Sequence, residues 1–260
     1  MNKIIKYSFY DLLRSKWSYA YLAFYLVIGF TLLFLNHNLS KAIITMMNLI
    51  LVLTPLIGTV FGVIYVYSSR EFTELLLAQP LKRSSIFLGQ FIGIAGSLSL
   101  SLIIGLGLPF LIYGLFLSAE IWNFLVLLFV GVCLTFIFVG ISFMISMTTE
   151  NKIKGFGIAI LTWLFLAVIY DGIFIVLLVS FSDYPLEKMA LASTFINPID
   201  LGRTLILLKL DISALLGYTG AVFKSFLNTT TGTLVSGVTL MLWILAPLQI
   251  MRYLVAKKDF

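Results

Sequence analysis

The side chains able to take part in specific chemistry are few, and the densest group of them lies between Arg70 and Gln90, in REFTELLLAQPLKRSSIFLGQ. Asp, Glu, Lys and Arg make up only 11% of the chain, yet five of them fall in this stretch: Arg70, Glu71, Glu74, Lys82 and Arg83. Charged groups at this spacing form ion pairs and recognise other proteins. Because long apolar runs flank the stretch, we expect it to lie just outside a membrane, where a partner can act on it.

Motifs of catalysis are absent from the sequence. It contains no G-x-x-x-x-G-K-[ST], H-E-x-x-H, C-x-x-C or G-x-S-x-G pattern. One histidine and one cysteine cannot supply an ordinary catalytic metal site. We therefore expect no catalytic, cofactor-binding or metal site in this chain, and we expect that it is not an enzyme.

Methionine and cysteine side chains raise the question of a copper(I) site, because thioethers and thiolates favour that ion. Met144 and Met147 share a helix face, whereas Met46 and Met47 point to different faces. Cys133 precedes Met144 by a distance of about 16 Å along a helix. The spacing brings no set of sulfur atoms together, and packing is the expected role of these residues.

Tyr170 and Asp171 lie deep in an apolar run. A carboxylate in hydrocarbon is costly and has to face protein or water. It could be neutral, or it could be paired with a tyrosine or an arginine. A structural hydrogen bond and a role in gating or cargo contact are the two interpretations of this pair.

Apolar runs dominate the chain that must position these groups. It has 260 residues, of which 61% are hydrophobic, and its mean hydropathy is +1.10. Backbone polar groups in a bilayer have no water to bond, so runs of about 20 residues are expected to be helices. The sequence predicts an all-α integral membrane protein with six spans, at about 17–35, 43–67, 86–112, 121–147, 155–180 and 233–254.

Basic residues gather at the ends of these spans, so the net charge of +6 does not indicate a nucleic-acid partner. Most of them lie in the N-terminal segment, the second and fourth loops and the C-terminal segment. The positive-inside rule places these segments, both termini included, in the cytoplasm.

The N-terminal residues 1–16 are predicted to form an amphipathic helix on the inner membrane surface. Apolar side chains recur at helical spacing, at Ile5, Phe9, Leu12 and Leu13, and basic ones at Lys3, Lys6 and Arg14. The helix serves either as a basic topology anchor or as an elbow helix that packs against a partner.

A second short helix is predicted after residue 67. Ser68 and Glu71 fit the S-x-x-E capping box, and Phe72, Leu75 and Leu76 form an apolar stripe. Pro80 disfavours helical geometry at Gln79 and so ends the helix. A plain solvated loop is the less favoured alternative, because a loop needs neither a cap nor a stripe.

Small residues recur every fourth position in the third span, at Gly89, Gly93, Ser97, Ser101 and Gly105. Such a ridge lets another helix approach closely. Packing within one subunit is favoured over a seam between subunits.

A third short helix is predicted in the long fifth loop, from residue 198 to about 216. Asn197 stands at its N-cap and Pro198 at its first position. Polar residues lie near one face, at Asp200, Arg203, Thr204 and Asp211. Two roles are open for this helix. Its polar face is available to a partner at the outer membrane interface, or the helix is a lid over the spans.

An N-terminal amphipathic helix, six spans and a segment with Glu71, Leu75–Leu77, Pro80, Arg83 and Gly89 resemble the permease subunits of ABC-2 transporters. The resemblance covers residues 1–260 as a single transmembrane domain. Residues 149–171, 196–211 and 217–223 resemble one branch of that family, whose permeases work with a periplasmic copper-handling partner in maturing nitrous oxide reductase.

This resemblance implies a homodimer in a bacterial inner membrane, bound to two cytoplasmic ATPase subunits that hold ATP and Mg²⁺. It implies that 70–79 is the coupling helix, with an apolar contact rimmed by charge (Arg70, Glu71, Phe72, Glu74, Leu75 and Leu76). The helix 198–216 would meet the periplasmic partner. A lipid, peptide or drug exporter is the alternative within the family, and an ATP-independent channel or secondary transporter is the alternative outside it.

Overall fold

The computed structural model describes residues 2–36, 38–181, 187–210 and 230–257, and every regular element in those ranges is a helix. Six segments are long and apolar enough to cross a membrane. They are α2 (Lys16–Asn36), α3 (Leu39–Ser68), α5 (Arg83–Ile112), α6 (Ile121–Thr148), a fifth span at Lys152–Leu177, and Gly232–Val255 within α12 (Thr230–Lys257). The predicted all-α class and the six predicted spans are confirmed.

Shorter helices join these spans. They are α1 (Asn2–Leu13), α4 (Arg70–Leu77), the 3-10 turn η1 (Leu115–Leu117), α9 (Glu187–Ile196) and α10 (Pro198–Lys209). Helix α10 begins where the sequence predicts, but it ends at Lys209. Asp211 and the rest of the predicted outer helix lie outside the described residues.

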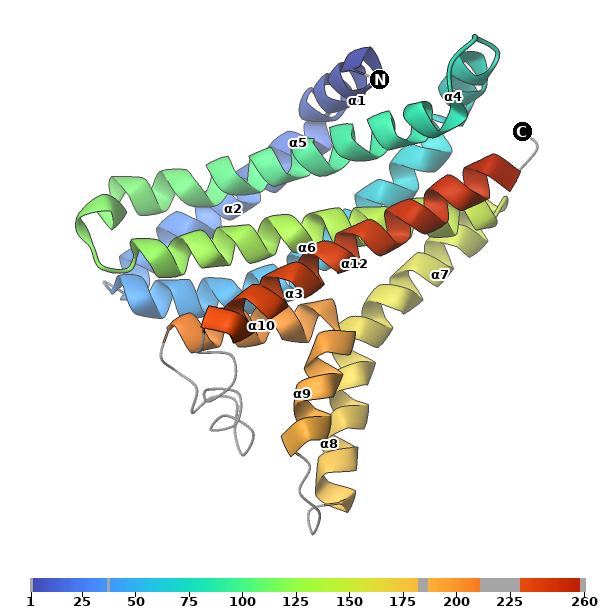
Figure 1. The fold of residues 1–260 in the computed structure, drawn as a ribbon. Helices are drawn as coiled ribbons and strands as arrows, with labels where there is room; N and C mark the ends of the chain where they lie inside the picture. Colours follow the sequence, from blue (N-terminus) through green and yellow to red (C-terminus); the bar gives the residue numbers. More distant parts are fainter. Residues whose placement is uncertain (1, 37, 182–186, 211–229, 258–260) are drawn as a thin grey trace.

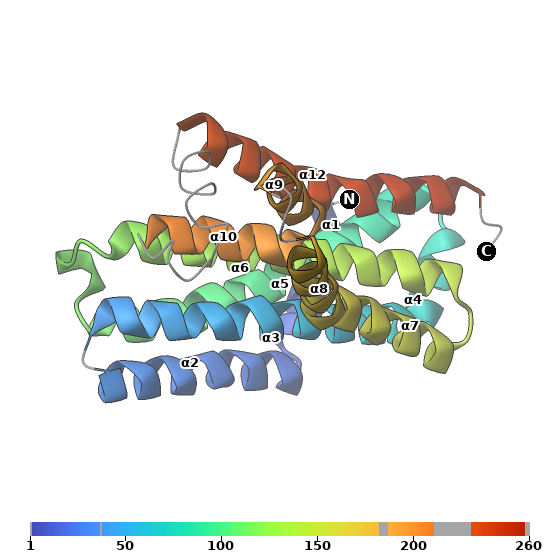
Figure 2. The same cartoon turned by 90° about the horizontal axis from the view of Figure 1, so that it is seen from below.

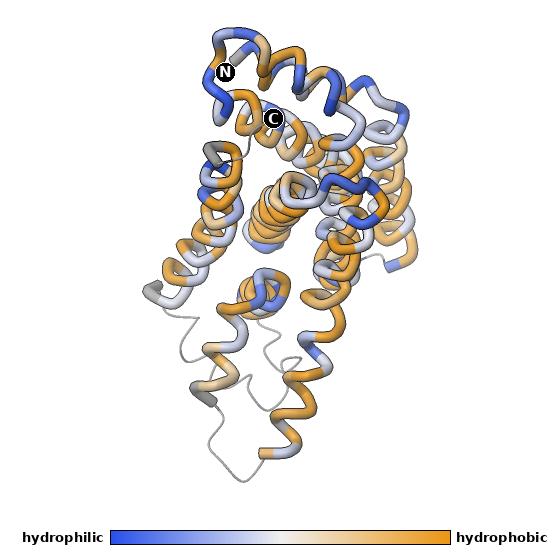
Figure 3. Tube along the Cα trace, turned by 90° about the vertical axis from the view of Figure 1, so that its right-hand side faces the viewer, coloured by the Kyte–Doolittle hydropathy of each residue, from blue (hydrophilic) through white to orange (hydrophobic). Residues whose placement is uncertain are grey.

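The two ends of the helix bundle differ in character. Helices α1 and α4 and the end of α12 lie toward one end, whereas α8 (Tyr170–Ser180) and α9 extend away from them at the opposite edge (Figure 1). Polar segments gather around α1 and α4, and apolar residues fill the spans between the two ends (Figure 3). This arrangement agrees with the grouping of the basic segments on one side of a membrane.

Helices α3 and α6 form the centre of the bundle, and small residues allow their close contact. A Cβ atom at Gly62 would lie 2.7 Å from the Cβ of Ser142. The Ser142 hydroxyl donates to the carbonyl of Thr59 across this contact, at 3.0 Å. In a bilayer, packing of this kind replaces the hydrophobic effect as the force that holds helices together.

The small-residue ridge of α5 packs against α1 and α2 of the same chain, as favoured from the sequence. A Cβ atom at Gly93 would lie 2.7 Å from the Cβ of Ser8 and 2.9 Å from the backbone nitrogen of Phe9. Further along the ridge, the hydroxyls of Ser101 and Ser18 lie 3.1 Å apart. The ridge therefore serves contacts inside one subunit.

The buried face of α1 is shifted by one residue from the prediction. Ile4, Ser8 and Leu12 are buried, whereas Ile5 and Phe9 are half-buried. The shift follows from the partner surface, since the glycines of α5 admit Ile4 and the small Ser8 at the closest points. Helix α1 is thus held by its own chain.

The fifth span is the least buried and the least regular of the six. It consists of α7 (Lys152–Leu164), a π-helical turn η2 (Phe165–Ile169) and α8. In its most apolar window no residue is buried, whereas the corresponding fraction for α5 and α6 is 67%. Its direction changes between α7 and α8, as two perpendicular views show (Figures 1 and 2).

Candidate functional site

Helix α4 follows α3 after one residue, and the predicted capping box does not form. The N-cap is Ser69, and no side chain caps the helix. The hydroxyls of Ser68 and Ser69 instead donate to the carbonyl of Tyr65, at 3.1 and 2.8 Å. Serine side chains commonly bond the carbonyls of the preceding turn, and here that turn is the end of α3. Glu71 therefore takes no part in a capping box, and its side chain is exposed.

A buried hydrogen bond fastens α4 to α5. Gln90 Nε2 donates to Thr73 Oγ1 at 2.8 Å, and the Thr73 hydroxyl donates to the carbonyl of Ser69 at 2.8 Å. Gln90 is 2% and Thr73 7% exposed. This bond was not predicted from the sequence, although Gln90 is a lone amide within the apolar run 86–112 and such a group has to find a partner.

The predicted apolar stripe of α4 divides into a covered part and a free part. Phe72 stacks on Tyr7 of α1, with ring centroids 4.7 Å apart. Leu76 is half-buried, and Leu75 is 69% exposed. Within the described chain, the apolar group that α4 presents most openly is therefore Leu75.

The charges of α4 lie beside this leucine. Arg70 Nε and Glu74 Oε1 form an i,i+4 ion pair at 3.1 Å, and their side chains are 60% and 59% exposed. Water and salt screen a pair this exposed, so it adds little to stability. Both groups are in a position to meet an incoming protein.

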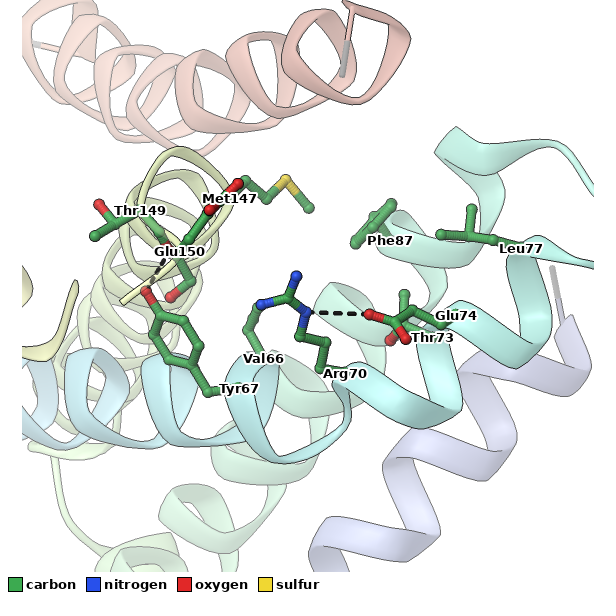
Figure 4. A pocket seen from close by; sticks show the side chains of 11 residues that line it. Val66, Tyr67, Arg70, Thr73, Glu74, Leu77, Phe87, Met147, Thr149 and Glu150 are labelled. Atoms are coloured by element: carbon green, nitrogen blue, oxygen red, sulfur yellow. Dashed lines mark hydrogen bonds and ion pairs between the residues drawn. The ribbon is translucent and has the colours of Figure 1, made fainter. Parts of the chain in front are cut away.

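A cavity of about 170 Å³ opens behind α4. Figure 4 shows Arg70 and Glu74 on one side of it and Glu150, which follows α6, on the other. The Tyr67 hydroxyl donates to the carbonyl of Thr149 at 2.7 Å across this region. The α3–α4 and α6–α7 connections are thus joined at the same end of the bundle.

A cluster of charged side chains occupies the other region of interest, where α8 meets α10. Arg203 Nη1 donates to Asp171 Oδ2 at 2.8 Å and to Asp200 Oδ1 at 3.2 Å. The side chains of Arg203, Asp171 and Asp200 are 32%, 28% and 16% exposed. Of the alternatives open for Asp171, pairing with an arginine is the one observed, and Tyr170 bonds the Ser193 carbonyl at 2.7 Å.

The predicted polar face of α10 is turned inward. Thr204 is 3% exposed, so in the single chain the side chain of this residue is covered. Asp200 and Arg203 are engaged with each other and with Asp171. The helix packs among α3, α6, α9 and α12, which favours the lid interpretation over an open polar face.

Asn197 joins α10 to the irregular turn of the fifth span. Its Oδ1 accepts from the Ile199 amide at 3.1 Å, as the predicted N-cap requires. Its Nδ2 donates to Asp200 Oδ2 at 3.1 Å and to the carbonyl of Leu166 at 2.8 Å. Leu166 lies in η2, and π-helical turns are frequent at functional sites.

The protonation of Asp200 is altered by these surroundings. Burial raises the pKa of its carboxyl, and the negative Asp171 raises it further, whereas Arg203 and Asn197 oppose the change; the resulting pKa is about 7. Two carboxylates that share one cation ordinarily retain a proton more readily than one carboxylate does.

Several of the sulfur-containing residues lie in the protein interior. Met46, Met47 and Cys133 are buried in the core, and Met147 lines the cavity behind α4. Among the described residues, no group of three or more His, Cys, Asp and Glu side chains is placed to hold a metal ion.

The sequence of the chain is similar to those of known proteins. The sequence model of a family described as "ABC-2 family transporter protein" matches residues 35–260. The chain is also similar to the protein named "Probable ABC transporter permease protein NosY" of Stutzerimonas stutzeri. The two are 24% identical over 209 residues, which cover 74% of this chain and 76% of the relative.

Proposed function

Because the chain belongs to the ABC-2 family of transporter proteins and is a permease subunit, we propose that α4 is where a separate ATPase subunit acts on it. A permease of this family implies ABC ATPase partners, and the six apolar helices imply a membrane protein. The ATPase subunits hold the ATP and Mg²⁺, and this chain carries out no catalytic step itself.

The observation that carries the proposal is that α4 is fastened to the bundle but open at its surface. Leu75 is 69% exposed, while the buried Thr73–Gln90 bond ties the same helix to α5. A force applied at Leu75 is therefore passed to α5 and, through one intervening residue, to α3. Arg70 and Glu74 form the charged rim of the contact, beside Glu71.

The assembly we propose is a homodimer with two ATPase subunits, surrounded by lipid in a bacterial inner membrane. Both termini and α4 lie in the cytoplasm. This orientation is supported by the basic residues, which gather at the end of the bundle that contains α1 and α4.

The substitution Leu75→Asp tests the role of α4. Truncating or charging an apolar anchor of an interface costs about 2 kcal/mol or more, which corresponds to a loss of affinity of roughly 30-fold. We expect the ATPase subunit to be lost from the purified complex and membrane-bound ATP turnover to fall. Leu117→Asp is a matched control, since Leu117 is 96% exposed and lies outside α4.

Normal association and turnover in Leu75→Asp, at the level of Leu117→Asp, would refute the assignment of α4. The genomic neighbourhood gives an independent check, because a transporter of this kind is expected beside a reading frame with a P-loop ATPase.

For the task of the transporter, we propose maturation of the copper–sulfur centre of nitrous oxide reductase, together with a periplasmic copper-handling protein. This is supported by the similarity to NosY, and by the three segments between residues 149 and 223 that resemble the corresponding branch. On α10, the part open to such a partner is the edge at Arg203, because Thr204 is buried.

Deletion of the gene tests this task. In the deletion strain, nitrous oxide reductase is expected to lack its copper–sulfide centre while its polypeptide is still made, and metal analysis of the purified enzyme measures this. A fully loaded enzyme would exclude the task. ATPase activity stimulated by a lipid, peptide or drug in liposomes would then favour the exporter function.

A further inference from the structure

The charged cluster between α8 and α10 is unbalanced in charge. Arg203 supplies one positive group, whereas Asp171 and Asp200 supply two carboxylates that contact the same Nη1 atom. If both carboxylates are ionised, the cluster carries one net negative charge in a largely apolar part of the protein. Charge without a partner is costly in such surroundings, and one added proton removes the imbalance.

Among the side chains that the structure describes, Arg203 is the cation that acts on Asp200. Helix α6 has no acidic or basic residue, and the described basic side chains of α3 and α12, Lys41 and Arg252, are exposed. From α8, Asp171 and the hydroxyl of Tyr170 lie close to Asp200. In α9, the charged residues Glu187 and Lys188 begin the helix, at the end remote from Asn197.

We propose that Asp200, which shares the Arg203 cation with Asp171, binds one proton, and that this proton holds α10 against the fifth span. With the proton bound, Asp171 and Arg203 form a neutral pair and Asp200 is an uncharged acid. When the proton leaves, two carboxylates compete for one guanidinium group and repel each other. The ligand of this site is a proton exchanged with water, to which the cluster is partly open.

The contacts around the cluster give the proton a mechanical effect. Asp200 Oδ2 accepts from Asn197 Nδ2, and the same amide group donates to the Leu166 carbonyl in the π-helical turn. Asp171 follows that turn after one residue. A change in the charge of Asp200 therefore acts on the start of α10 and on the point where the fifth span changes direction.

Infrared spectroscopy of the purified protein tests proton binding directly. We expect the carbonyl band of a protonated carboxyl group at pH 6, lost at pH 8 and missing from Asp200→Asn at both values. Glu74→Gln is the matched control, since Glu74 belongs to an exposed arginine pair, and it should retain the band. In Asp171→Asn the band should disappear already at a lower pH, because the repulsion that favours the proton is gone.

Absence of the band at pH 6 in the wild-type protein, or its persistence in Asp200→Asn, would overturn the proposal. Because the measurement needs no ATPase subunit and no cargo, its result is independent of whether α4 docks such a subunit.

Hydrogen exchange of the amides in 199–209 tests the mechanical effect. After correction for the intrinsic dependence of exchange on pH, opening of α10 should be about tenfold more frequent at pH 8 than at pH 6. Asp200→Asn keeps the Arg203–Asp171 pair and should show no such change. An equal change in the wild type and in Asp200→Asn would show that the proton does not hold α10.

Discussion

An exposed arginine–carboxylate pair on α4 contrasts with a more buried one between α8 and α10, and the surroundings give the two different roles. Arg70 and Glu74 lie on one short helix with about 60% of each side chain exposed. Arg203 joins Asp171 and Asp200 from two separate helices, and these three side chains are mostly buried. The exposed pair is screened by water and remains available to a partner, whereas the buried cluster fixes how two parts of the chain lie together.

The largest loss of stability is expected for Arg203→Met. The substitution leaves Asp171 and Asp200 without their cation, and unpaired charges in a protein interior commonly cost 3–5 kcal/mol; with partial exposure, we expect about 3 kcal/mol. Unfolding in detergent, followed by circular dichroism, measures this loss. Arg203→Lys should recover part of it, and a loss below that of Arg70→Met would reverse the contrast between the two regions.

The next effect is a dependence of stability on pH that comes from the buried cluster. The pKa of Asp200 is raised from 3.8 to about 7 in the folded chain, so the folded state binds the proton more tightly. The resulting stability is fully present below pH 4, falls as the pH rises toward 7, and is constant above it. Between pH 5 and 8 the free energy of unfolding should drop by roughly 2.5 kcal/mol.

The same pH series applied to Asp200→Asn and to Glu74→Gln separates the contribution of the buried cluster from that of the exposed pair. The decline should vanish in the first variant and remain in the second. A decline that persists unchanged in Asp200→Asn would assign it to other groups.

A smaller effect is expected where α4 is fastened to α5. In Thr73→Val the buried amide of Gln90 loses its acceptor, which costs about 1.5 kcal/mol. Chemical unfolding in detergent measures it, and the double variant Thr73→Val, Gln90→Leu should recover most of the loss. If the single variant leaves stability unchanged but lowers ATP-driven turnover, the bond serves transmission of force more than folding.

The smallest effect on stability is expected for Arg70→Ala. An exposed i,i+4 pair contributes about 0.5 kcal/mol or less, so unfolding should be almost unchanged. Association with the ATPase subunit, measured at low and high salt, should respond more strongly. A stability loss comparable to that of Arg203→Met would remove the distinction on which the comparison rests.

The features that the sequence predicts well depend on residues that are adjacent along the chain. Apolar runs locate the six spans to within a few residues, and Asn197 before Pro198 identifies the start of α10. Both signals are local, because span length and helix capping depend on adjacent residues.

What the sequence does not reveal depends on residues that meet only in the folded chain. Asp171 could be seen to need a partner, but its contact with Arg203 spans 32 positions. Ser68 matches a capping pattern, yet its hydroxyl is used by the preceding helix. The π-helical turn at Phe165–Ile169 has no composition of its own, since its residues are ordinary members of an apolar helix.

That turn also sets the rotational phase of everything that follows it in the fifth span. Each residue of an α-helix advances the chain by about 100° around its axis, so a widened turn rotates α8 relative to the register of α7. If the same five residues, Phe165–Ile169, formed an ordinary α-helical turn, Asp171 would swing to another side of the span, away from Arg203. Removing one of them would let a continuous α-helix form with Asp171 still near its present face. The widening of this turn thus decides which face of the helix carries the carboxylate.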